Sequence, residues 1–287
     1  MPIRACWGLC GRPPDPLRQT LIFLSHEKNM SILSSIENKI IVESFTDKET
    51  GAGVKFVVVD YKYPFCKKNN IRRIEFQNGE SYLYSSVYLS EKRDFQPMYP
   101  CAQRMIDCFF DKSGVDDALV LGCAGCTFPR FLINRYADCE VTGVEYSSQI
   151  IEIAKKYFIT DKMKSRFEIV NDDAFMYIKE VPERRFDLVF VDIFVAEKIH
   201  SSIFSESFIS DLYRICGENS MAVFNLFGVG EGKAQRFVES LDVPFDNMYV
   251  IEDYRKFFLA LTKCKDISRT ERFEKKITHY ADIRFKK

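Results

Sequence analysis

The chain has 287 residues, 46% of them hydrophobic and 29% charged, so it is long enough to bury one large core or two smaller ones. Its 41 basic and 41 acidic residues balance, which argues against a protein that binds nucleic acid or a membrane surface through net charge. No apolar run approaches the roughly 20 residues that a membrane-spanning helix needs. Ten cysteines in so long a chain favour buried reduced thiols, and with them a cytoplasmic location.

Residues 1–29 differ from the rest of the chain, because they contain the only Trp, a cluster of prolines and no clear periodicity. We expect them to be a disordered or non-native extension. Residues 30–95 are predicted to form a small antiparallel β-sheet domain, since four segments are rich in β-branched and aromatic residues. Asn78-Gly79 supplies a hairpin turn between the last two. These strands are predicted over Ile40–Phe45, Val54–Tyr61, Ile71–Phe76 and Tyr82–Leu89.

A helix over Phe95–Phe110 is expected to connect this sheet to the next region, residues 96–265, where strands and helices alternate. Such alternation predicts an α/β domain with a parallel sheet covered by helices on both faces. Strands are expected over Ala118–Leu121, Glu140–Val144, Phe167–Val170, Leu188–Val191, Met221–Leu226, Tyr249–Glu252 and Phe257–Thr262. Helices are expected over Phe128–Tyr136, Ser148–Phe158, Asp173–Ile178, Glu206–Cys216 and Glu231–Leu241.

Only four residues separate the last two strands, which is too few for a helical crossover, so these strands should be antiparallel. The predicted fold is therefore a seven-stranded, Rossmann-like sheet of the methyltransferase type with a terminal antiparallel hairpin. Residues 266–287 are predicted to be a charged tail on the surface.

A glycine-containing turn, Gly122-Cys123-Ala124-Gly125, follows the first strand of this domain, and the second strand ends on Glu145. Small residues allow a backbone to approach a ligand closely. An acidic residue about 20 positions later is placed to accept hydrogen bonds from ribose hydroxyls. The combination predicts a bound cofactor of the adenosine type.

Carboxylates also follow the third and fourth strands of the domain. Asp172, Asp173 and Ala174 come after the third strand, and Asp192 ends the most apolar segment, FDLVFVD. Because ligands bind at the carboxyl ends of parallel strands, these residues are candidates for the same site. Asp173 and Ala174 could bind an adenine edge, and Asp192 could hold an amine or accept its proton. The alternative is that these residues only cap helices and turns.

Cys123 and Cys126 form a Cys-x-x-Cys within the turn. A structural zinc site would need a second such pair, which the sequence lacks, so no metal is expected. We interpret the two thiols as small side chains in glycine-like positions.

Taken together, these segments resemble the spermidine synthase-like branch of the class I S-adenosylmethionine-dependent methyltransferase fold. The similarity covers roughly Ile40–Thr262 and is carried by LVLGCAGCTFPR, VTGVEYSSQIIEIAKKYF, IVNDDAFMYI, FDLVFVDIF and SESFISDLYRIC. The resemblance implies that Gly122, Gly125 and Glu145 hold the amino-acid part and ribose of the cofactor. It also implies adenine binding by Asp173 and Ala174, and a catalytic role for Asp192.

The chain departs from that family at several positions. Asp192 is followed by Ile193-Phe194-Val195, where spermidine synthases have a second Asp and a Pro. A single carboxylate should bind a diammonium substrate poorly, because the distal charge is left unpaired.

The sequence thus predicts a transferase that binds S-adenosylmethionine or its decarboxylated form and moves a methyl or aminopropyl group to a small nucleophile such as an amine. Two alternatives remain, a catalytically degenerate binding module and a nicotinamide-dependent oxidoreductase. The expected partner is a small-molecule substrate, with no nucleic acid and no membrane, and a homodimer is left open.

Overall fold

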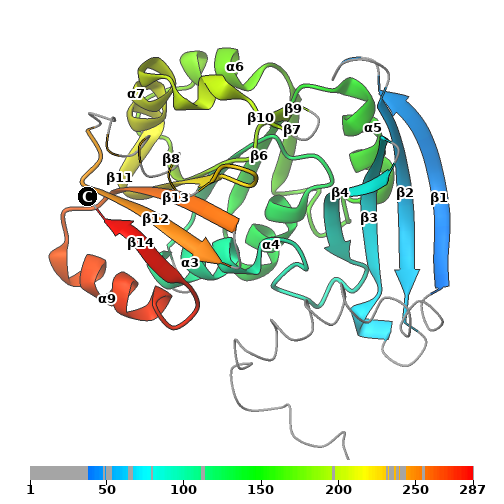
Figure 1. Cartoon of the computed structure of the whole chain (residues 1–287), viewed down its shortest axis with the longest axis horizontal. Coiled ribbons are helices and arrows are strands. Elements are labelled where there is room, and N and C mark those ends of the chain that lie inside the picture. Colours follow the sequence, from blue (N-terminus) through cyan, green and yellow to red (C-terminus); the bar gives the residue numbers. More distant parts are fainter. Residues whose placement is uncertain are drawn as a thin grey trace, which may run out of the picture.

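The computed structural model describes residues 38–286 except 48, 50–53, 64–66, 79, 111–113, 196–197, 231, 233–235, 237–238, 240–243 and 254–255. The expected extension over residues 1–29 lies outside this range, as does most of the helix expected over Glu231–Leu241. Figure 1 shows a small sheet beside a larger α/β unit.

The small sheet is antiparallel, with its strands in the order β1-β2-β3-β4, and confirms the predicted β-rich N-terminal region. β3 and β4 pair up to Asn78 and Glu80, as the predicted hairpin requires, whereas Gly79 of the expected turn lies outside the described residues. A short 3-10 helix, η1 (Lys67–Asn69), lies between β2 and β3. The strand bounds are β1 Asn38–Asp47, β2 Val54–Lys62, β3 Ile71–Asn78 and β4 Glu80–Tyr88.

The large sheet has the strand order β14-β12-β13-β11-β8-β5-β6-β7. Strands β5, β6, β7, β8 and β11 pair in parallel. β13 is antiparallel to β12, as their short connection predicts, and also to β11. The bounds are β5 Asp117–Leu121, β6 Glu140–Glu145, β7 Phe167–Asn171, β8 Phe186–Val191, β11 Cys216–Asn225, β12 Asn247–Asp253 and β13 Lys256–Lys263.

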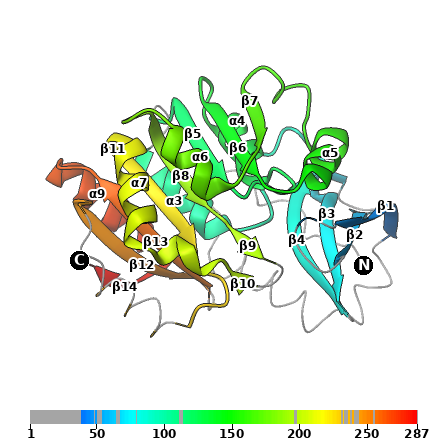
Figure 2. The same ribbon diagram turned by 90° about the horizontal axis from the view of Figure 1, so that it is seen from above.

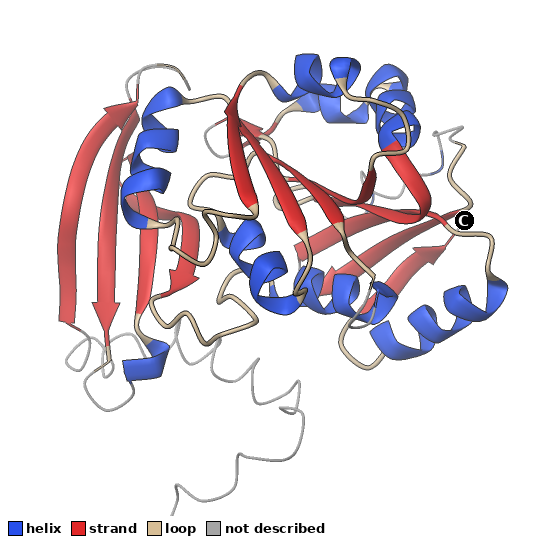
Figure 3. Cartoon of the chain, turned by 180° about the vertical axis from the view of Figure 1, so that it is seen from behind, coloured by secondary structure: helices blue, strands red, loops and turns tan. Residues whose placement is uncertain are grey.

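Helices cover both faces of this sheet, as Figure 3 shows. One face carries α3 (Pro100–Phe110), α4 (Thr127–Arg135), α5 (Ser148–Tyr157) and α9 (Ile267–Ile277). The other carries α6 (Ala174–Glu180) and α7 (Glu206–Ile215), with a short 3-10 helix η2 (Ser201–Phe204) and a two-strand ribbon, β9 (Phe194–Val195) and β10 (Lys198–Ile199).

The C-terminal segment corrects the expectation of seven strands followed by a charged tail. α9 buries Phe273 and Ile277, which lie one turn apart, and is capped by the Asp266 side chain. β14 (Asp282–Lys286) then pairs antiparallel with β12 and extends the sheet to eight strands. The sequence analysis did not predict this amphipathic helix, because most of its residues are polar or charged and only two of them are buried.

Two helix starts also differ from the expectation. α3 begins at Pro100 rather than Phe95, since proline suits the first helical position and Tyr99 before it has φ 54°. α6 begins at Ala174 because Asp173 is its N-cap and has an extended backbone.

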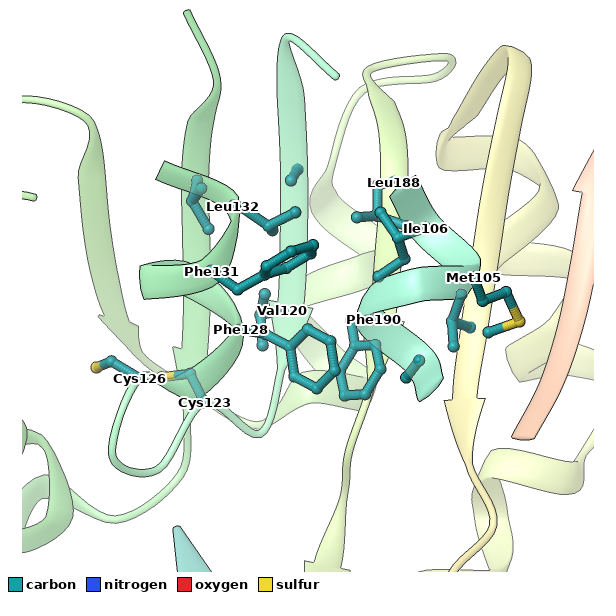
Figure 4. Close-up of a cluster of buried hydrophobic side chains, with 14 of the residues drawn as sticks. Met105, Ile106, Val120, Cys123, Cys126, Phe128, Phe131, Leu132, Leu188 and Phe190 are labelled. Atoms are coloured by element: carbon teal, nitrogen blue, oxygen red, sulfur yellow. The ribbon is translucent and has the colours of Figure 1, made fainter. Parts of the chain in front are cut away.

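The core consists of two layers that share the central strands. Val120 and Phe190 point to the layer under α3 and α4, where Phe190 stacks on Phe128, as Figure 4 shows. Their neighbours Leu121 and Val191 point to the layer under α6 and α7. This alternation follows from the two-residue period of a strand and explains why central strands are apolar throughout.

Candidate active site

The glycine turn lies directly against the chain that leaves β8. Gly122 has φ +81°, and a Cβ on it would come within 2.3 Å of the carbonyl oxygen of Asp192. The Asp192 N–H donates to the Leu121 carbonyl at 2.8 Å, so the two strand ends are held together by backbone contacts. Glycine is therefore required at 122 both by its backbone conformation and by the lack of space.

Gly125 serves a different purpose, because it faces the small sheet. A Cβ there would lie 2.6 Å from the Ser85 hydroxyl of β4. Ser85 and Thr127 are hydrogen-bonded at 2.9 Å, and Thr127 also donates to the Ser86 carbonyl. The turn is thus one of the places where the small sheet contacts the α/β domain, beside the β5–β7 half of the large sheet (Figure 2); α5 also contacts the small sheet, through Lys156 and Glu43.

Ala124 and Cys126 adopt the left-handed conformation that glycine favours, with φ of 37° and 58°. The Cys123 and Cys126 side chains are both buried. A hydrogen bond with Cys126, together with burial, raises the pKa of the Cys123 thiol well above its usual range. Within the described part of the chain, no group of three or more His, Cys, Asp or Glu side chains could hold a metal ion.

Glu145 ends β6 behind this turn and is buried. One carboxylate oxygen accepts from the Ala124 N–H at 3.0 Å, and the other from the Ser147 N–H at 3.2 Å. Burial raises the pKa of Glu145 against these hydrogen bonds. The Tyr146 backbone also donates to it, and since a carboxylate offers about four acceptor positions, about one is left for a ribose hydroxyl.

The residues after β7 lie along the same edge but do not line the pocket next to the turn. The Asn171 amide donates to the Glu145 and Tyr146 carbonyls and fixes the turn between β6 and α5. Asp172 accepts from the Asp173 N–H at 2.7 Å, and Asp173 caps α6 by accepting from the Phe175 N–H at 2.7 Å. The capping interpretation therefore describes Asp173 in this structure, with Ala174 at the first helical position.

Asp192 is partly buried, lines a small pocket and faces the glycine turn. One of its oxygens accepts from the Asn225 amide at 2.7 Å. Burial raises the pKa of Asp192 to about 7, the hydrogen bond from Asn225 opposes this rise, and the charge of Glu145 adds to it. A carboxyl group with such a pKa can exchange a proton with an amine near neutral pH.

Asn225 is missed by the sequence reasoning, which extends the strand to Leu226 and inspects only the residue after each strand. It is the last residue of β11 and is 1% exposed. A single amide in the apolar segment MAVFNLF is the signal that could have identified it.

Three further residues reach the site that the sequence analysis does not assign to it, two from the small sheet and one from the segment before α3. Tyr84 and Tyr99 line the pocket, and burial together with the charge of Asp192 raises the pKa of each phenol well above its usual range. Asp47 is fully buried at the end of β1, and its charge acts on both Tyr84 and Glu145. These contacts depend on how the two sheets pack, so no local pattern predicts them.

The residues that line the pocket include no Lys, Arg or His; they are Tyr84, Ser85, Met98, Tyr99, Val120, Gly122, Cys123, Ala124, Thr127, Phe128 and Asp192. Beyond Tyr99, the Lys256 Nζ lies 5.7 Å from the Tyr99 ring centre and 5.9 Å from that of Phe227, and its charge also acts on Asp253. Two predicted carboxylates, Glu145 and Asp192, thus make this edge of the sheet acidic.

The chain is similar in sequence to known proteins. Residues 119–225 match the spermine/spermidine synthase domain. Over 126 residues the chain is 31% identical to a polyamine aminopropyltransferase of Neisseria meningitidis, which covers 44% of this chain and 47% of the relative. A polyamine aminopropyltransferase of Chromobacterium violaceum is 26% identical over 184 residues, 64% of this chain and 68% of the relative. The chain therefore spans about half the length of the Neisseria relative.

Solved structures show the same fold. A probable spermidine synthase from Corynebacterium glutamicum superposes with a TM-score of 0.63 over 83% of this chain and 87% of its own, at 16% identity. A spermidine synthase from Thermotoga maritima gives 0.51 over 80% and 75%, at 14% identity. No helix in the described part of the chain is both long and apolar enough to cross a bilayer.

Proposed function

We propose that this chain transfers an aminopropyl group from decarboxylated S-adenosylmethionine to a small amine. Its fold is that of the spermidine synthase-like branch of the class I S-adenosylmethionine-dependent proteins. One observation carries the proposal. Asp192 faces the pocket with a pKa near 7, in surroundings that contain further carboxylates and no lining cation.

The charge of the pocket supports the choice of cofactor form. S-adenosylmethionine carries a carboxylate that needs donors or a cation beside it, whereas the decarboxylated form has only positive charges. Asp192, Glu145 and the buried Asp47 would repel that carboxylate and attract an ammonium and a sulfonium. The remaining acceptor position of Glu145 suits a ribose hydroxyl, and the glycine at 122 allows the ends of β5 and β8 to lie close together beside the pocket.

The bound cofactor would supply a carbon made electrophilic by the adjacent sulfonium. Asp192 would accept the proton of an acceptor amine, whose nitrogen then forms the new bond to that carbon while the carbon–sulfur bond breaks. The Tyr84 and Tyr99 phenols, kept neutral by burial, would orient the amine and exclude water. In this proposal the chain contributes positioning and one proton acceptor.

Methyl transfer remains the second candidate, because the fold alone is shared by methyltransferases. The third is a binding module that has lost catalysis, motivated by Ala124 and Cys126 in glycine-like conformations. The intact contacts of Gly122, Glu145 and Asp192 favour an enzyme over that module.

Calorimetric titration with S-adenosylmethionine and with its decarboxylated form tests the proposal. We expect the decarboxylated form to bind at least about tenfold more tightly, since a buried like-charge contact costs on the order of 1 kcal/mol or more. Mass spectrometry of an amine incubated with each cofactor then identifies the transferred group. Preference for S-adenosylmethionine with methylated product would establish methyl transfer, and binding of neither cofactor would reject both enzymatic readings.

An Asp192→Asn variant separates binding from catalysis. It should keep cofactor affinity within about threefold and lose at least about a hundredfold in turnover, because general-base catalysis typically contributes that much. Asp246→Asn, on the exposed surface before β12, is the matched control and should retain full activity.

A further inference from the structure

The Asn225 side chain is hydrogen-bonded to Phe227 and Asp192, which together fix the direction of its amide, and it also interacts with the Tyr99 phenol. Its side-chain oxygen accepts from the Phe227 N–H at 3.0 Å, and its NH₂ group donates to Asp192 at 2.7 Å. Because the Phe227 N–H can only donate, the oxygen must face it, and the NH₂ group must face Asp192. The side chain is 1% exposed, so it cannot exchange these partners for bulk water.

The second carboxylate oxygen of Asp192 has no hydrogen-bond donor among the described residues, and Asp192 lines the pocket. Asn225 thus occupies one side of the carboxylate and leaves the other side for a ligand. The remaining charged or titratable groups that act on Asp192 come from other elements, namely Glu145 of β6, Tyr84 of β4 and Tyr99 before α3.

We infer that Asn225 is the positioning residue of this site, which holds the Asp192 carboxylate with one oxygen turned to the acceptor amine. The catalytic part of this inference rests on the proposed function. The amide also favours the ionised form of Asp192, because a donor stabilises a carboxylate more than the neutral acid. Without it, burial and the charge of Glu145 act unopposed.

Two variants test this role. Asn225→Asp has nearly the same shape and can still accept from Phe227, but it presents no donor to Asp192. Asn225→Leu removes the donor without adding a charge. Asn247→Asp is the matched control, because Asn247 lies in the same sheet and donates to the neutral Thr262 hydroxyl at 3.2 Å.

The readout is the carbon-13 NMR titration of the Asp192 carboxyl group in the full chain, assigned by its absence in Asp192→Asn. We expect the midpoint to move to higher pH by about one unit or more in both Asn225 variants, as expected for loss of a hydrogen bond to a charged group. The Asn247→Asp midpoint should match the parent protein. An unchanged midpoint in both folded Asn225 variants would overturn the inference.

The rising limb of the pH profile of kcat should move in the same direction, while cofactor affinity stays unchanged. A lower rate with an unmoved pH profile would mean that Asn225 is only structural. Because the NMR titration needs no turnover, its outcome is separate from that of the proposed function. If the midpoint of the Asp192 carboxyl moves but the protein transfers no group, the proposed function is wrong. The inference that Asn225 positions Asp192 would still stand.

Discussion

Replacing Asp192 by Asn should stabilise the protein at neutral and alkaline pH. The pKa of this carboxyl is raised from 3.8 to about 7, mainly because burial disfavours the charge. Between about pH 4 and 7 this carboxyl is therefore protonated in the folded state and ionised in the unfolded state. Because of this difference, the free energy of unfolding falls as pH rises through that range. Asn carries no charge at any pH and can still accept from the Asn225 amide.

The size of the effect follows from the two pKa values. A difference of about 3 pH units corresponds to roughly 4 kcal/mol in the free energy of unfolding. Below pH 4 the variant and the parent protein should be equally stable. Above pH 4, the free energy of unfolding of the variant should exceed that of the parent protein by a difference that grows by up to about 1.4 kcal/mol per pH unit. The difference should level off above pH 7.

Urea unfolding of both proteins at intervals from pH 4 to 9 measures this difference. Asp266→Asn provides a control of opposite sign, because hydrogen bonds from Ser268 and the backbone lower the pKa of Asp266 at the start of α9. Its variant should lose stability relative to the parent as pH rises from the acid range. A constant difference between Asp192→Asn and the parent at every pH would refute the reasoning that Asp192 is desolvated.

Three further predictions concern the same site. Gly122→Ala should lower the free energy of unfolding by about 3 kcal/mol or more, measured by urea unfolding. Gly228→Ala, which has the same φ of +81° but open space around it, should lower it by about 1 kcal/mol. Equal losses in the two variants would rule out the contact of residue 122 with the Asp192 carbonyl. Glu145→Gln should raise the Kd of the decarboxylated cofactor at least about tenfold, measured by calorimetry, because an amide oxygen cannot replace both carboxylate oxygens. An unchanged Kd would mean that Glu145 does not bind the ribose. Among four-carbon amines ending in an ammonium, a methyl or a carboxylate group, the carboxylate-ended amine should give the lowest kcat/KM, by on the order of tenfold, because Asp192, Glu145 and Asp47 make the pocket acidic. A carboxylate-ended amine that the protein prefers over the other two would contradict this prediction.

Local patterns were sufficient for much of the fold. The alternation of apolar strands and amphipathic helices predicts the parallel sheet, and the four-residue connection before Phe257 predicts the antiparallel hairpin. The small antiparallel sheet follows from its β-branched segments and the Asn-Gly turn. The added strand β14 was not predictable in this way, since its place is set by pairing with β12 and not by its own composition.

The sequence by itself determined which residues stand at the ends of the parallel strands, and so predicted Gly122, Glu145 and Asp192 as neighbours. Their order in the chain dictates this, because successive parallel strands deliver their carboxyl ends to one edge of the sheet. Only the tertiary structure decided the charge and protonation of the site. Tyr84 and Asp47 reach it from a separate sheet, and Asn225 meets Asp192 across 33 residues of sequence. Burial, reinforced by the charge of Glu145 and opposed by the Asn225 hydrogen bond, brings the pKa of Asp192 close to neutral pH, and no local pattern encodes these contacts.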